Sequence, residues 1–310
     1  MLEESQLNPA QLAKQRKVRR TIIELGLFKK RGLKKRTKRN LALSSLERKR
    51  INNVEYILGT KNGLMNQIFN RSVLILMDLK QREAWNENHK ILTEIILKPE
   101  EHSRTIQLFL SQHALLHSSA IGNTGKLTLE DEVLANLDEK TFRNYPAATP
   151  DTKNSIAWHL WHIARIEDMT MNILIANDQQ VLFTQSWYEK MNNDFSHSGN
   201  NMSEAEIAEL SSRIDFHSLI AYREAVGRQT RQVLSLLKPG QFKLKVEQNR
   251  IKRLFDENAV TQNANWLTDY WSKKSIAGLI LMPATRHNYL HLNKCIRIKD
   301  KFHKQIKNPL

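Results

Sequence analysis

Histidines at helical spacing are the residues in this chain most suited to chemistry. His287 and His291 are four apart, so in a helix both rings project from one face, one turn apart. Apart from one thiol, the rest of that stripe is apolar, which predicts that the two rings point into the protein. Two neutral imidazoles in this arrangement can hold one divalent metal ion. The other members of the stripe are Ile276, Ile280, Ala284, Cys295 and Ile298.

Two more histidine pairs widen the choice of ligands. His113 and His117 repeat the four-residue spacing in an earlier segment, and they are either pocket residues or histidines of the core. His159 and His162 are three apart, which places them about 60° apart around a helix, so at least one of them faces the core. A third imidazole from this segment would complete a metal site with the later pair.

The polar and aromatic residues beside these histidines have simpler interpretations. Cys295 lies one turn beyond His291, where it is either a further ligand or a small buried side chain, and the second interpretation is favoured. Glu167 and Asp168 can act as acid or base groups or orient a ligand, but they lie off the face of His162. This position favours solvent exposure or a structural salt bridge for both carboxylates. The tryptophans expected to pack in the core are Trp158, Trp161 and Trp271.

Helices must position these residues, because the chain has few helix breakers. Only 7 Pro and 10 Gly occur in 310 residues, which argues against a turn-rich all-β protein. The second long helix is expected to begin after Asp151 or Asn154, and residues 242–246 are expected to form a short strand or an extended turn. The apolar periodicity predicts four long helices, over 100–121, 152–177, 216–237 and 274–306, after a shorter helix over 82–97. Four such helices predict an all-α four-helix bundle.

Two motifs carry a resemblance to a known family. The segment Trp-His-Leu-Trp-His-Ile at 158–163, followed by an acidic pair, and the segment Pro-Ala-Thr-Arg-His at 283–287, with His291 downstream, are similar to the DinB/YfiT-like superfamily of four-helix-bundle metalloproteins. The resemblance covers roughly residues 77–304. Members typically place one metal histidine on helix 2 and two, four apart, on helix 4. The resemblance therefore implies that His162, His287 and His291 bind a metal.

The resemblance also implies a kind of chemistry. Three neutral imidazoles leave at least one metal position open for water or substrate. Imidazole suits Zn, Ni, Cu or Fe, and the expected cofactor is a divalent Zn, Ni or Fe ion. Several relatives use a low-molecular-weight thiol, such as bacillithiol, mycothiol or glutathione, in S-transfer or isomerisation. The implied function is a metal-dependent S-transferase that joins such a thiol to a small-molecule substrate.

The positive charge is concentrated at one end of the chain. Residues 1–76 hold 18 of the 48 Lys and Arg but only five of the 32 Asp and Glu, whereas all 11 His, all 6 Trp and the single Cys come later. The densest stretch, residues 29–39, is a phosphate-binding arm, a solvated tail that is disordered or partly helical, or a segment upstream of a natural start at Met77 or Met65. No aromatic residue lies among these charges to stack on bases, which favours the last two interpretations. The expected division is a basic extension over 1–76 and a bundle domain over 77–310.

Other classes of function stay open or are excluded by composition. A non-enzymatic protein that binds a metal or small ligand is one alternative, and a nucleic-acid binder acting through residues 14–50 is a second, though nucleic acid is not the expected partner. One Cys cannot form a disulfide within the chain, and with no secretory signal this predicts a reducing, cytoplasmic setting. No apolar run approaches the ~20 residues that a membrane helix needs. A homodimer is compatible with these features.

Overall fold

The computed structural model describes residues 63–122 and 127–307, with side chains described for 79–122 and 127–304. Contacts divide the chain into two compact units, Met1–Val73 and Leu74–Leu310, and all described side chains belong to the second. Of the predicted basic extension, residues 1–62 lie outside the described residues, and residues 63–76 form the start of a helix. The boundary predicted at Met77 stays a prediction.

Helices account for the regular structure of the described residues, apart from two isolated β-bridges, Thr149↔Thr152 and Lys245↔Ser275. None of these helices is both long enough and apolar enough to span a bilayer. Two segments, η3 and η6, are π-helical, and η2, η4 and η5 are short 3-10 turns. In chain order the elements are α3 (Gly63–Ile95), η2 (Pro99–Glu101), α4 (His102–Ala114), α5 (Ser119–Gly122), α6 (Leu129–Leu134), α7 (Glu139–Arg143), α8 (Ile156–Asp168), η3 (Met169–Ala176), α9 (Val181–Thr184), α10 (Trp187–Lys190), α11 (Glu204–Arg213), α12 (Phe216–Leu236), η4 (Gln241–Lys243), α13 (Gln248–Asp256), η5 (Gln262–Ala264), α14 (Asn265–Ser272), α15 (Ile276–Leu281), η6 (Met282–His287) and α16 (Asn288–Lys307).

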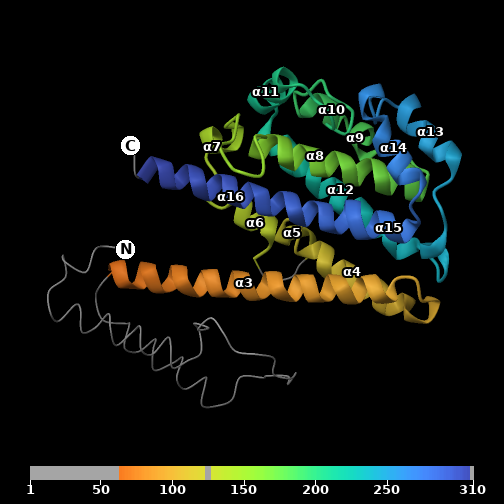
Figure 1. Cartoon of the computed structure of the whole chain (residues 1–310), viewed down its shortest axis with the longest axis horizontal. Coiled ribbons are helices and arrows are strands. Elements are labelled where there is room, and N and C mark those ends of the chain that lie inside the picture. The colour runs from red at the N-terminus through yellow and green to blue at the C-terminus, as the bar shows by residue number, and fades with distance from the viewer. Residues whose placement is uncertain (1–62, 123–126, 308–310) are drawn as a thin grey trace, which may run out of the picture. The chain divides into compact units, whose positions relative to one another are not determined.

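Four helical rods form the bundle that the sequence predicts. The first is α4 with α5, the second α8 with η3, the third α12, and the fourth α15, η6 and α16 in continuous succession. The second rod contacts the third and fourth, and α4 contacts α12 and η6, which closes the ring of four. Figure 1 shows α16 lying alongside α8. The prediction of an all-α four-helix bundle is confirmed.

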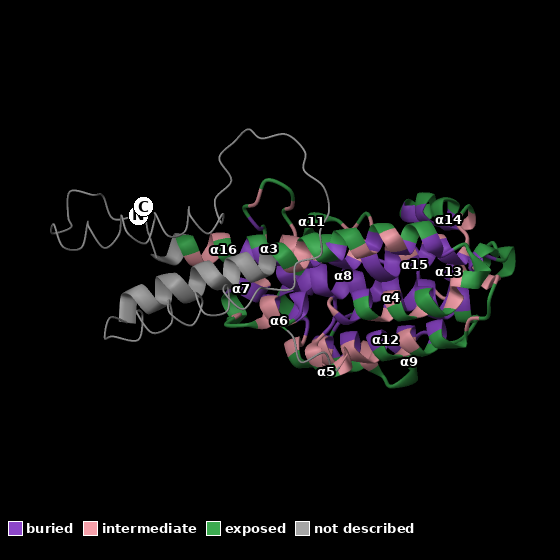
Figure 2. Cartoon of the chain, turned by 90° about the horizontal axis from the view of Figure 1, so that it is seen from below, coloured by how far each residue is buried: buried purple, intermediate pink, exposed green. Residues whose placement is uncertain are grey.

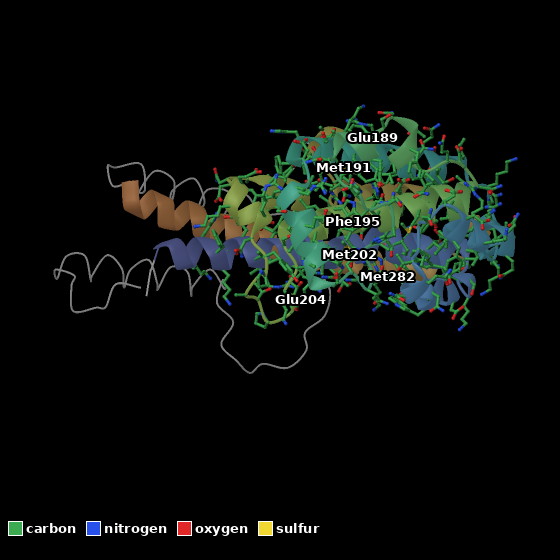
Figure 3. All side chains as sticks on the ribbon, turned by 90° about the horizontal axis from the view of Figure 1, so that it is seen from above. Glu189, Met191, Phe195, Met202, Glu204 and Met282 are labelled. Atoms are coloured by element: carbon green, nitrogen blue, oxygen red, sulfur yellow. The ribbon has the colours of Figure 1, made fainter. Side chains whose placement is uncertain are left out.

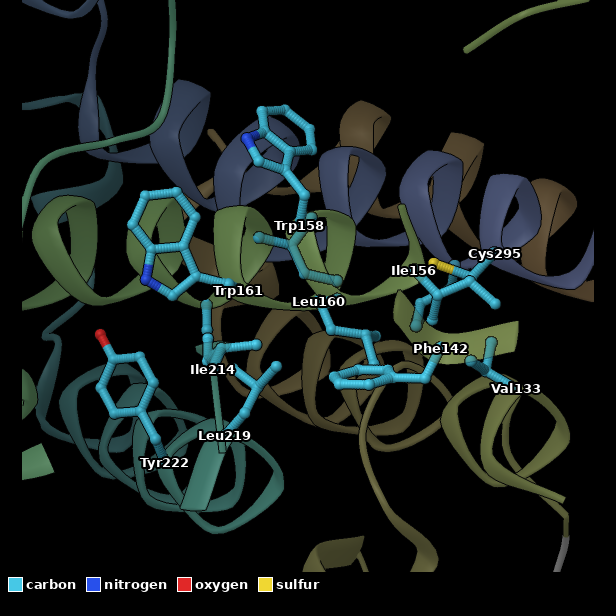
Figure 4. Close-up of a cluster of buried hydrophobic side chains, with 14 of the residues drawn as sticks. Val133, Phe142, Ile156, Trp158, Leu160, Trp161, Ile214, Leu219, Tyr222 and Cys295 are labelled. Carbon is cyan, nitrogen blue, oxygen red and sulfur yellow. The ribbon is translucent and has the colours of Figure 1, made fainter. Parts of the chain in front are cut away.

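The second rod lies at the centre of the apolar core. Every residue of α8 is buried, and buried positions (purple in Figure 2) run along it and α15. One apolar cluster surrounds Trp158 and Trp161, and another surrounds Trp271, so the predicted packing role of these tryptophans is confirmed. Part of the first cluster is drawn in Figure 4. Burial of apolar area at about 25 cal/mol per Å² stabilises this arrangement, but it also removes water from every polar group on α8.

The first rod is broken where one continuous helix was predicted. The expected helix over 100–121 divides into α4 and α5, separated by residues 115–118. The carbonyl of Leu115 accepts a hydrogen bond from the backbone N–H of Leu129, at 2.9 Å, which lies in a later segment of the chain. This long-range bond takes an acceptor that a continuing helix would need, so the helix ends there.

Three further details of the elements become clear in the structure. The second rod begins at Ile156, because the hydroxyl of Ser155 accepts the backbone N–H of Trp158 at 3.0 Å, so neither Asp151 nor Asn154 is the cap. The predicted uniform helices over 152–177 and 274–306 both contain a π-helical segment, η3 and η6. Residues 242–246, expected to form a short strand or an extended turn, contain the end of a 3-10 turn, the extended residue Leu244 and one bridge residue, Lys245.

Gly227 on α12 leaves the space that the ring of His117 occupies. A Cβ at Gly227 would lie 2.8 Å from His117 Nδ1 and 3.0 Å from Cε1. We predict that Gly227→Ala lowers the free energy of unfolding by about 1–3 kcal/mol, because overpacking outweighs the gain in helix propensity. Urea denaturation measures this change.

Gly278→Ala is the matched control, since a Cβ there meets only the flexible side chain of Lys274 at 3.3 Å. It should change the stability by less than about 1 kcal/mol in either direction. Equal stability of the wild type and Gly227→Ala would show that the ring of His117 is not held in place.

Candidate metal centre

Three histidines from two rods come together in the bundle. His162 on α8, His287 at the end of η6 and His291 on α16 each offer one ring nitrogen, and these nitrogens all lie within 4.8 Å of one another. Ring centroids are 5.0 Å apart for His162–His287 and for His162–His291, and 4.4 Å apart for His287–His291. Nitrogens about 2.0–2.1 Å from one ion lie about 3.3 Å apart, so this set, called the triad below, is close enough to gather around an ion by moving inward.

His162 is held by a loop that passes close to α8. Its Nδ1 donates to the carbonyl of Ser198 at 2.6 Å, which leaves Nε2 as the nitrogen with a free lone pair. Gly199 permits this approach, because its φ is +81° and a Cβ there would lie 2.5 Å from the ring of Trp161. Phe195 and Met202, labelled in Figure 3, belong to the same segment and pack against the apolar cluster. Trp158 stacks on the His162 ring at 4.4 Å between centroids.

His291 is oriented by a fourth histidine. Nδ1 of His291 lies 2.9 Å from Nδ1 of His159, and Nε2 of His159 lies 3.0 Å from the hydroxyl oxygen of Thr152. Two tautomer arrangements satisfy these contacts, and the one in which His159 donates to Thr152 and accepts from His291 leaves Nε2 of His291 free to bind a metal. His159, whose role the sequence left open, is therefore a positioning residue of the triad.

The π-helical segment η6 brings His287 to the site. In this segment Thr285 donates to the carbonyl of Ile280, five residues back, at 3.0 Å, and Asn288 donates to that of Pro283 at 3.1 Å. These side chains satisfy carbonyls that a regular helix would pair. Nδ1 of His287 is buried and has no hydrogen-bond partner among the described residues. Such π-helical turns often mark functional sites.

Burial keeps the imidazoles of the site neutral near pH 7. It lowers the pKa of His162 to about 4 despite the bond to Ser198, and it lowers the pKa of His159 to about 3, assisted by the nearby His162. Burial and the neighbouring histidines also hold the pKa values of His287 and His291 well below the ordinary value. Neutral imidazole is the form that binds a metal ion.

A second polar cluster lies between α4 and α8. Nε2 of His113 lies 2.8 Å from Glu167 Oε1, and Nε2 of His117 lies 3.1 Å from Oε2 of the same carboxylate. Asn288 donates its side-chain N–H to Glu167 Oε2 at 2.9 Å. Although burial alone would raise it, the two histidines hold the pKa of Glu167 well below its usual range. The two histidines are thus polar partners of a buried carboxylate.

The expectation of solvent exposure for Glu167 and Asp168 was wrong, because both side chains are fully buried. Asp168 forms the structural salt bridge that was the other expectation, at 3.1 Å from Arg165. It also accepts from Tyr222 at 2.7 Å and from the backbone of Val181 and Leu182. Asp168 thereby fixes the chain after the second rod.

Cys295 has the environment of a core residue. Its side chain is fully buried in the apolar cluster and is drawn beside Ile156 in Figure 4. Burial raises the pKa of its thiol to about 12, so the thiol stays protonated near neutral pH. A metal ligand would have to be the thiolate, which favours the interpretation of Cys295 as a small buried side chain.

Sequence reasoning missed the groups around the triad. Ser198 and Thr152 act through a loop carbonyl and a hydroxyl, for which the sequence carries no recognisable signal. For Glu167 the sequence did carry a signal. Glu167 lies four residues after Ile163 and seven after Leu160, which places it on the inward face of α8.

Fold and site together define the chain as an all-α bundle with a cluster of histidines suited to a divalent transition metal. A family model described as the DinB superfamily matches residues 123–292, which is more than half of the chain and includes the whole triad. The chain therefore belongs to the DinB superfamily. The resemblance inferred from the two histidine motifs is confirmed.

Comparisons with solved structures and with curated proteins give less information about this chain. A crystal structure described as the conserved protein of locus from Enterococcus faecalis is 18% identical, covers 62% of this chain and 95% of its own, and has a TM-score of 0.41. At that score the likeness bears on neither fold nor function. No curated protein matches the chain significantly.

Removing the bond between His159 and His291 should weaken metal binding without abolishing it. We predict that His159→Phe, which keeps a buried ring, lowers the affinity of the triad for a divalent ion by about 10–100-fold. Competition with a chelator measures the affinity. His217→Ala, which removes an exposed histidine of α12, is the control and should leave the affinity unchanged; an unchanged affinity in His159→Phe would show that His159 positions nothing.

Acid should destabilise the metal-free protein. His113, His159 and His162 have folded-state pKa values of about 4, 3 and 4, below the ordinary 6.5. Between pH 6.5 and 4 the unfolded chain therefore binds protons that the folded chain does not, so stability falls as the pH falls. By pH 5 the loss should be on the order of 2 kcal/mol for each buried histidine. Urea denaturation at pH 7, 6 and 5 checks this, and a flat profile would contradict it.

Proposed function

We propose that this protein is a metal-dependent enzyme that transfers a low-molecular-weight thiol to an electrophilic small molecule at the histidine triad. The proposal rests on one observation above all. The ligand nitrogens of His162, His287 and His291 lie within 4.8 Å of one another, and His287 and His291 are partly exposed residues. Transfer at the triad requires a substrate to reach the point on which the three nitrogens converge.

The donor set fits a first-row divalent ion. All three ligands are imidazoles held neutral, two of them have their second nitrogen engaged by a neighbour, and a bound ion would have an open position for a thiol. When bound, such an ion lowers the pKa of a coordinated thiol and makes it a nucleophile near neutral pH.

The residues of the chain supply orientation. Ser198 fixes the tautomer of His162 so that its Nε2 is free, and His159 orients the ring of His291 through the contact between their Nδ1 atoms. Lys294, which is partly exposed and whose charge lowers the pKa of the triad histidines, adds positive charge beside the site. This charge favours an anionic substrate, and low-molecular-weight thiols commonly carry carboxylates.

A non-enzymatic metal-binding protein is the second candidate, and one observation favours it. Two surface clefts of about 620 and 600 Å³ are present, but both are lined by residues around Asn177–Gln179 and neither is lined by the triad. Because neither of these two clefts opens onto the triad, the site is more suited to holding an ion than to turning over a bulky substrate.

Turnover decides between the two candidates. Full-length protein loaded with zinc or nickel should conjugate a thiol such as bacillithiol or glutathione to monochlorobimane. The rate should be proportional to the concentration of the protein. His291→Ala should remove one ion per chain and reduce the rate by at least about 100-fold, because a triad ligand is lost.

His217→Ala should keep both the metal and the rate. Metal bound at the triad with no turnover for any thiol would favour the non-enzymatic candidate. Full turnover in His291→Ala would place the chemistry elsewhere.

A further inference from the structure

We infer that His113, His117 and Glu167 form a second divalent-cation site, separate from the triad, which takes a zinc-class transition-metal ion. One ligand atom from each of these three side chains lies within 4.8 Å of the others, and all three side chains are fully buried. Two imidazoles and one carboxylate are a donor set that zinc and ferrous iron both accept. Two of the three residues precede the part of the chain that matches the family model.

The geometry already converges on one point. Both Nε2 atoms lie on one carboxylate, at 2.8 and 3.1 Å, and the two rings are 4.3 Å apart. Ligand atoms bound to one zinc ion lie about 3.3 Å apart. For each of these two nitrogen–oxygen pairs, binding to a common ion would change the separation by only a few tenths of an ångström.

Charge in the core also favours a cation here. Asp168 is paired with Arg165, and Glu130 with Arg223 at 2.8 and 3.3 Å. Glu167 forms no salt bridge with any Lys or Arg in the described parts of the chain, and its partners are two imidazoles and an amide. A divalent ion bound by the two imidazoles would add a full positive charge beside this buried carboxylate.

The outer nitrogens of the two rings point to the same conclusion. While each Nε2–H donates to Glu167, each Nδ1 is a bare lone pair, and both Nδ1 atoms are buried without a hydrogen-bond partner. With an ion on Nε2, the proton moves to Nδ1 of the same ring, so none is released. For His117 a carboxylate oxygen is near, since Nδ1 lies 3.9 Å from Glu130 Oε2, which is beyond hydrogen-bond distance. A closer approach of this oxygen to an Nδ1–H would give the carboxylate–histidine–metal arrangement of protein metal sites.

Asn288 connects this site with the triad. Its amide N–H bonds Glu167 Oε2 at 2.9 Å, and it follows His287 directly in the chain. Its side-chain oxygen is buried and unpaired among the described residues. Because the site has no exposed ligand, the ion should enter as the protein folds and exchange slowly.

Metal counting in a variant without the triad tests this inference separately from the proposed function. Full-length wild type and His162→Ala/His291→Ala are produced in zinc-supplemented medium and analysed for zinc per chain. The expected result is two ions in the wild type and one in the double variant, with unchanged helical circular dichroism. One ion in the wild type and none in the folded double variant would overturn the second site but leave the triad intact.

Glu167→Gln, made in the double variant, should lose the remaining ion, whereas Glu189→Gln, at an exposed position, should keep it. Retention of zinc in Glu167→Gln would overturn the inference. If the double variant does not fold, the wild-type chain is used alone. Two zinc ions per chain that are lost during dialysis at different rates support two sites, and a single zinc ion per chain contradicts the second site.

Discussion

Burial of polar groups on the central helix is the constraint on which the rest of the structure depends. Each residue of α8 is removed from water, yet this helix carries two histidines, an arginine and two carboxylates. Such groups are tolerated in a core only with partners, so the neighbouring rods and loops must supply them. Ser198, Tyr222 and Asn288 do so from three different segments.

The two polar clusters on α8 meet this constraint in different ways. At one end, His162 faces two imidazoles and no carboxylate, so the rings can stay neutral and their lone pairs converge. At the other, Glu167 brings a negative charge between His113 and His117. We propose that a divalent ion completes each arrangement; His287, the last residue of η6, belongs to the first cluster, and Asn288, the next residue, bonds Glu167 of the second.

The sequence predicted the fold, and it predicted that His162, His287 and His291 come together, because the signals for both are local. Apolar spacing within each rod indicated the helices, and the order of His162, His287 and His291 matched a known family. What it did not predict depends on contacts between distant segments. The break after Ala114 arises from a bond between Leu129 and Leu115, and the hold on His162 arises from a loop 36 residues later. Glu167 was misplaced because its position was judged against His162 instead of against Ile163 and Leu160, whose face it shares.

Anomalous X-ray diffraction at the zinc edge, from crystals of the zinc-loaded full-length protein, tests the central claim most directly. We expect a strong peak about 2.1 Å from one ring nitrogen of each of His162, His287 and His291. A well-ordered bundle that shows no peak there, with those nitrogens too far apart to share an ion, would contradict the account.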